Sequence, residues 1–117
     1  VVHWGDPAFD SGFLLNHLLL KAIHQPQFAK LYLSAAGAFW RSLAAGIEPA
    51  GGEDLELMTI RHLGALMLAR VDGKSPVEYI QNEATKGHVR SVGKRILLEP
   101  PPHLNSVFEW VLRETRA

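Results

Sequence analysis

The sequence contains no cysteine, and this absence excludes a disulfide scaffold, a thiolate metal site and a cysteine nucleophile. It also lacks an excess of one charge, because 12 Lys and Arg balance 12 Asp and Glu. A balanced chain has no overall field that attracts nucleic acid or an anionic membrane. Long apolar runs are missing too: Asn16 and His17 interrupt the stretch 13–20, which is far shorter than the roughly 20 residues of a membrane span.

What is present is typical of one helical domain. The chain has 117 residues, of which 47% are hydrophobic and 21% charged, enough for a single hydrophobic core. Apolar residues recur at spacings of three and four, and no alternating run indicates a strand. We therefore predict an all-α bundle of five or six helices that occupies 1–117 as a single domain.

Glycine and proline divide the chain into its expected helices. These span about 8–23, 27–45, 53–71, 76–82 and 83–98, with a last helix from 104 onward. The segment 46–52 contains Pro49, Gly51 and Gly52 and is predicted to be a loop. Ser75 and Glu78 have the spacing of a capping box and open the short fourth helix. The first helix is apolar nearly all the way round, which places it in the middle of the bundle.

Two acids stand at the start of the first helix. Asp6 precedes Pro7 and is predicted to cap the helix, whereas Asp10 is expected to be a partly buried hydrogen-bond acceptor. Because they are four residues apart, they could instead pair on a metal ion. One pair of carboxylates holds a metal poorly, so we expect no metal site.

A local basic run lies within the segment 83–99. Lys86, Arg90 and Lys94 are four residues apart and form one ridge on the predicted helix. The ridge could contact phosphate, in a ligand or in nucleic acid. A solvated helix face is the favoured interpretation, because no aromatic residue lies among these cations. Nucleic-acid binding is thus the weakest functional alternative.

The segment Gly5-Asp6-Pro7-Ala8-Phe9-Asp10 resembles a motif of the aminoglycoside phosphotransferase-like kinases, which include choline and methylthioribose kinases. In that family Gly-Asp-Pro-x-x-Asp opens the helical part of the C-lobe. The stretches 61–64 (Arg-His-Leu-Gly) and 69–79 also fit bacterial members, so the resemblance covers the whole chain. It implies that Asp10 anchors the catalytic loop by accepting hydrogen bonds from it.

The complete family uses ATP and Mg²⁺, with a catalytic base from a His-Gly-Asp loop and a metal ligand from a short acidic motif. Neither motif nor the mainly β nucleotide-binding lobe occurs in these 117 residues. We therefore expect a cytoplasmic C-lobe fragment that is not catalytically competent alone. It would have no catalytic, cofactor-binding or metal-binding residue of its own, and the small-molecule acceptor of a complete relative stays open. The alternative is a standalone helical binding or dimerisation module.

Self-association is a further expectation from the resemblance. A C-lobe without its other parts would expose apolar surface, and identical chains can cover such a surface in a two-fold dimer. Trp4 is the predicted interface anchor, with Trp40 or Trp110 as second candidates.

Overall fold

The structure, a computed structural model, describes residues 7–46, 49–73 and 78–116, with the side chains of all but 7–9 and 49–53. These residues form five α-helices and one short 3₁₀ helix, and no strand occurs among them. The helices are α1 (Pro7–His24), α2 (Ala29–Ala45), α3 (Pro49–Asp72), α4 (Glu83–Leu98) and α5 (Leu104–Arg116), and the 3₁₀ helix η1 (Pro26–Phe28) joins α1 to α2. The predicted all-α class is confirmed.

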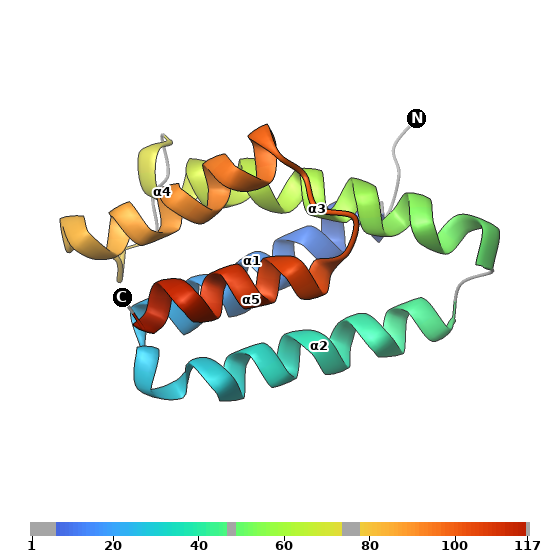
Figure 1. Cartoon of the computed structure of the whole chain (residues 1–117), viewed down its shortest axis with the longest axis horizontal. Coiled ribbons are helices and arrows are strands. Elements are labelled where there is room, and N and C mark those ends of the chain that lie inside the picture. The colour runs from blue at the N-terminus through green and yellow to red at the C-terminus, as the bar shows by residue number, and fades with distance from the viewer. Residues whose placement is uncertain (1–6, 47–48, 74–77, 117) are drawn as a thin grey trace.

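Helix α1 is the centre of the bundle, as its apolar surface predicts. It contacts α2, α3, α4 and α5, and Figure 1 shows it between α2 and α3 with α5 in front. Leu15, Leu19 and Leu20 are fully buried on it. Burying each such side chain stabilises the fold by about 1.5–3 kcal/mol relative to leaving it exposed.

The other helices supply the remaining core through one buried face each. Those side chains are Ile60, Leu63 and Met67 on α3, Val89, Val92 and Ile96 on α4, and Leu104, Val107 and Val111 on α5. Helix α2 contributes the least, since only Ala29 and Ala36 are buried on it. It packs against α1 and α5 and forms the outer layer in Figure 1.

Helices α3 and α4 approach closely through two glycines. A β-carbon on Gly64 would lie 2.8 Å from Cγ2 of Ile96, and one on Gly93 would lie 3.0 Å from Cγ of Leu68. Because Gly64 and Gly93 have no side chain, the backbones of α3 and α4 can approach each other closely here.

Some helix bounds match the prediction and others do not. Helix α4 begins and ends where expected, and the side chain of Asn82 caps it by accepting hydrogen bonds from the backbone N–H groups of Ala84 (2.7 Å) and Thr85 (3.3 Å). The short helix predicted over 76–82 was wrong in its described part, because residues 78–79 form a turn and 80–82 have no regular secondary structure.

The predicted loop over 46–52 was wrong for residues 49–52, whereas Gly46 does lie outside the helices and 47–48 lie outside the described residues. Helix α3 begins at Pro49 and runs through both Gly51 and Gly52. Proline fits a first helical position because its missing N–H would have no partner there. Each glycine costs a helix about 1 kcal/mol relative to alanine, and the packing of α3 along both α1 and α4 offsets that cost.

Across the described ranges, none of the helices combines the length and the apolarity that crossing a lipid bilayer requires.

Candidate functional site

Asp10 lies in the first turn of α1, and its side chain is exposed. The expectation of partial burial was therefore wrong: Asp10 is on the face of α1 opposite the core leucines. No described residue forms a hydrogen bond or an ion pair with its carboxylate. The other two residues predicted at this end, Trp4 and Asp6, lie outside the described residues.

The helix turn that carries Asp10 is held firmly against α3. The hydroxyl groups of Ser11 and Thr59 are 2.7 Å apart in a buried hydrogen bond. A β-carbon on Gly12 would lie 3.1 Å from Cβ of His62, so the two helices are in close contact one residue further on. Asp10 thus occupies a fixed position at the surface.

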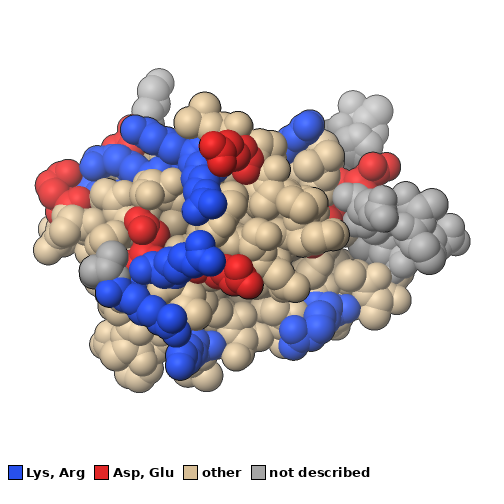
Figure 2. All heavy atoms as spheres, in the orientation of Figure 1, with Lys and Arg blue, Asp and Glu red and all other residues tan. Residues whose placement is uncertain are grey.

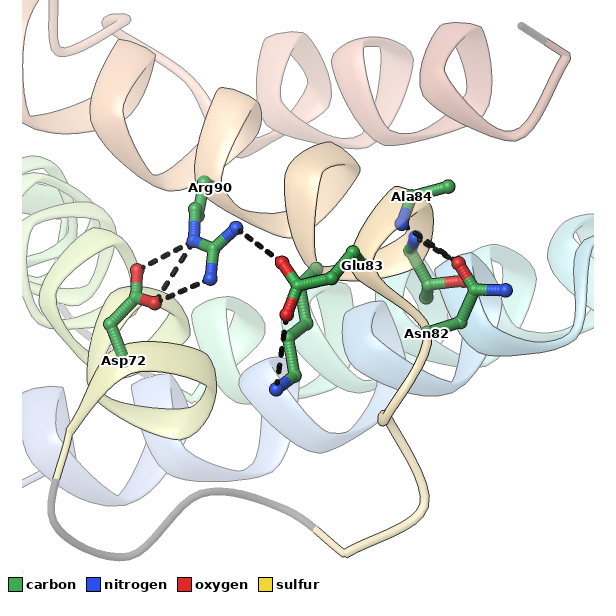
Figure 3. A network of polar contacts seen from close by, with 7 residues as sticks. Asp72, Asn82, Glu83, Ala84 and Arg90 are labelled. Atoms are coloured by element: carbon green, nitrogen blue, oxygen red, sulfur yellow. Dashed lines mark hydrogen bonds and ion pairs between the residues drawn. The ribbon is translucent and has the colours of Figure 1, made fainter.

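The predicted cationic ridge on α4 is largely neutralised by acids (Figure 3). Arg90 donates hydrogen bonds to both carboxylate oxygens of Asp72, at 2.7 and 2.9 Å, and another to Glu83 at 3.4 Å. Lys86 Nζ lies 3.8 Å from the same Glu83. Of the three ridge residues, Lys94 alone has no carboxylate partner among the described residues. Arg90 therefore joins α4 to the end of α3. Because Lys86 and Arg90 are paired with acids, the ridge is a poorer candidate for binding phosphate.

The Arg90 guanidinium lowers the pKa of the Asp72 carboxyl group, chiefly by donating hydrogen bonds to it. Because this pKa is lower in the folded chain, the ion pair stabilises the fold above the ordinary carboxyl pKa of about 3.9. That contribution is lost as the pH falls through the lowered pKa.

We predict that NMR titration of the Asp72 carboxyl carbon gives a midpoint below the ordinary carboxyl value. The substitution Arg90→Gln should raise the midpoint, and Lys94→Gln should raise it less, because Lys94 acts only through its charge. An unchanged midpoint in Arg90→Gln would contradict the assignment of the shift.

A second long-range contact fixes the start of α5. Glu56 of α3 accepts a hydrogen bond from the backbone N–H of Leu104 at 2.9 Å, and its other oxygen is 3.3 Å from Nδ1 of His103. A carboxylate at a helix N-terminus satisfies a donor that has no partner within the helix and interacts favourably with the helix dipole. Glu56 is therefore a structural cap provided by a different helix.

A small pocket opens between α4 and α5. Its volume is about 130 Å³, and it is lined by Ser91, Val92, Arg95, Trp110, Arg113 and Glu114. The Arg95 guanidinium carbon lies 3.8 Å from the centre of the Trp110 ring. The sequence analysis placed neither Arg95 nor Arg113 among the candidate residues. The available signal was the spacing of Ser91 with Arg95 and of Trp110 with Arg113, which puts each pair on one helix face.

The two described tryptophans are both half-buried and pack against the core. Arg95 covers one face of Trp110. These positions make Trp40 and Trp110 parts of the fold first, and weaker candidates for an interface anchor than the sequence suggests.

No group of three His, Asp or Glu side chains in the described part of the chain could hold a metal ion. Comparisons of this chain with protein-family models, with curated proteins and with solved structures give no match.

Proposed function

We propose that this chain is the helical C-lobe part of an aminoglycoside phosphotransferase-like kinase. In this role it backs the catalytic loop, contributes one wall of the acceptor site and does not transfer phosphate by itself. ATP and Mg²⁺ would bind the complete enzyme through residues outside this chain. Such an enzyme would act in the cytoplasm on a small-molecule acceptor.

The position of Asp10 is the observation that carries this proposal. The last four residues of the Gly-Asp-Pro-x-x-Asp motif, 7–10, form the first turn of α1, the helix that contacts all four others. The last acid of the motif, Asp10, is exposed, and the turn that carries it is fixed to α3. The Asp10 carboxylate has no hydrogen-bond or ion-pair partner among the described residues. A carboxylate in this state is available to accept N–H groups from a loop that lies outside these residues.

The coding DNA upstream of Val1 provides the test. The proposal predicts an in-frame His-Gly-Asp segment and, a few residues before Val1, a short acidic Asp-x-Glu motif. An upstream reading frame without both would contradict the proposal and favour a standalone helical module. Binding to nucleic acid through the ridge is disfavoured, because Lys86 and Arg90 are paired with acids.

We further propose that the isolated chain forms a dimer. Its described part exposes apolar side chains on α1 (Phe13 and Leu14) and on the first half of α3 (Leu57 and Met58). A stable interface buries about 1,200–2,000 Å² in total. Trp4 remains the proposed anchor.

Sedimentation equilibrium at tens of micromolar is expected to show a dimer that Trp4→Ala weakens. The control is Leu98→Ala at the end of α4, which changes the most exposed large hydrophobic side chain that the structure describes. A clean 13 kDa monomer would contradict dimerisation. An equal loss in the two variants would contradict the choice of Trp4.

A further inference from the structure

The pocket between α4 and α5 is built from one face of each helix. Ser91 and Arg95 are one turn apart on α4, and Trp110 and Arg113 are one turn apart on α5. Val92, 2% exposed, lies at its base. Figure 2 shows basic side chains on both sides of the seam between these helices, with acidic ones among them.

The two arginines of this pocket form no ion pair with a described acid. Among the described residues, neither Arg95 nor Arg113 lies within ion-pair distance of a carboxylate, in contrast to Arg90. The Arg95 guanidinium carbon lies over the Trp110 ring, 3.8 Å from its centre. Contact with a ring face leaves the N–H donors at the edge of a guanidinium group available. Ser91, Arg95 and Arg113 therefore line one small space.

One acid also lines the pocket. Glu114 has an oxygen 3.3 Å from Nδ1 of His88, on the neighbouring turn of α4. That contact occupies one of the two carboxylate oxygens. The other can accept a hydrogen bond from a protonated ligand oxygen. With Arg95 and Arg113 present, the lining keeps a net positive charge.

We propose that this pocket binds a single phosphate group, either free inorganic phosphate or the terminal phosphate of a small molecule. Guanidinium groups match phosphate oxygens with paired N–H donors. A volume of about 130 Å³ gives room for a tetrahedral anion, since one water takes about 30 Å³ of liquid. The pocket opens at the surface between the two helices, so the rest of a larger ligand would extend into solvent.

The test is a titration of the whole chain with inorganic phosphate, in which the NMR signal of the Trp110 indole N–H reports binding. We expect a saturable shift, and Arg113→Gln should weaken binding about tenfold or more, because charge-assisted hydrogen bonds are lost. The matched control is Arg41→Gln, which removes another exposed arginine, on α2, outside the pocket. It should change the affinity less than about twofold, as expected for a distant surface charge.

Arg95→Gln provides a second variant, and it should also weaken binding. Thermal unfolding of each variant checks that the fold is retained. A phosphate monoester that binds more tightly than inorganic phosphate would identify a small molecule as the source, and the reverse order would identify free phosphate. The absence of saturation, equal binding of acetate, or an equal loss in Arg41→Gln would each overturn the proposal.

Discussion

Replacing Gly64 by alanine is expected to lower the free energy of unfolding by about 1–3 kcal/mol, the usual cost of overpacking a core. The new β-carbon would lie 2.8 Å from Cγ2 and 3.1 Å from Cβ of Ile96. Ile96 is fully buried and branched at Cβ, so it cannot move aside cheaply. Helices α3 and α4 would have to separate.

Gly87 offers a matched control on α4. A β-carbon there meets nothing within 4 Å, so Gly87→Ala should raise the free energy of unfolding by about 0.5–1 kcal/mol through the better helix propensity of alanine. Urea unfolding of both variants measures the difference. If Gly64→Ala also stabilised the chain, the close packing of α3 on α4 would be contradicted.

Replacing Asn16 by leucine is expected to raise the free energy of unfolding by about 1–3 kcal/mol, the cost of a buried polar group left without a hydrogen bond. Asn16 is 0% exposed in the middle of α1. Within the described part of the chain, neither its amide nitrogen nor its amide oxygen has a hydrogen-bond partner. Leucine has the same branched shape and no polar atom that must leave water.

The control for this change is Asn105→Leu on α5, where the asparagine is exposed. Surface substitutions of this kind usually stay within about 0.5 kcal/mol. Urea unfolding again provides the comparison. A lower stability of Asn16→Leu would show that the buried amide has a stabilising role that its surroundings do not reveal.

Local signals were sufficient to predict most of the fold. The end of α4 follows from the proline run 100–102, whereas the asparagine that caps its start, Asn82, was not singled out from the sequence. The apolar surface of α1 predicts its central place. The start of α3 was missed because Gly51 and Gly52 are read as breakers when their tertiary contacts are not known.

The candidate sites were less predictable, because their partners are distant in the sequence. Arg90 contacts Asp72 across 18 residues, and Glu56 caps α5 from 48 residues away. The ridge was predicted from spacing within one helix, which does not show that acids of other segments face it. Arg95 and Arg113, which form no ion pair with a described residue, come together only when α4 and α5 pack against each other.

The most direct test of the proposed function compares two proteins by isothermal titration with ATP·Mg²⁺. One is the isolated 117-residue chain, and the other is the product of the natural reading frame with its upstream sequence. Because the family places its phosphate-gripping and metal-binding groups outside these residues, the longer protein should bind ATP·Mg²⁺ at micromolar concentration. The isolated chain should show only the weaker, magnesium-independent binding of a phosphate group in the pocket between α4 and α5. Micromolar binding by the isolated chain, or no binding by the longer protein, would contradict the assignment of this chain to a kinase C-lobe.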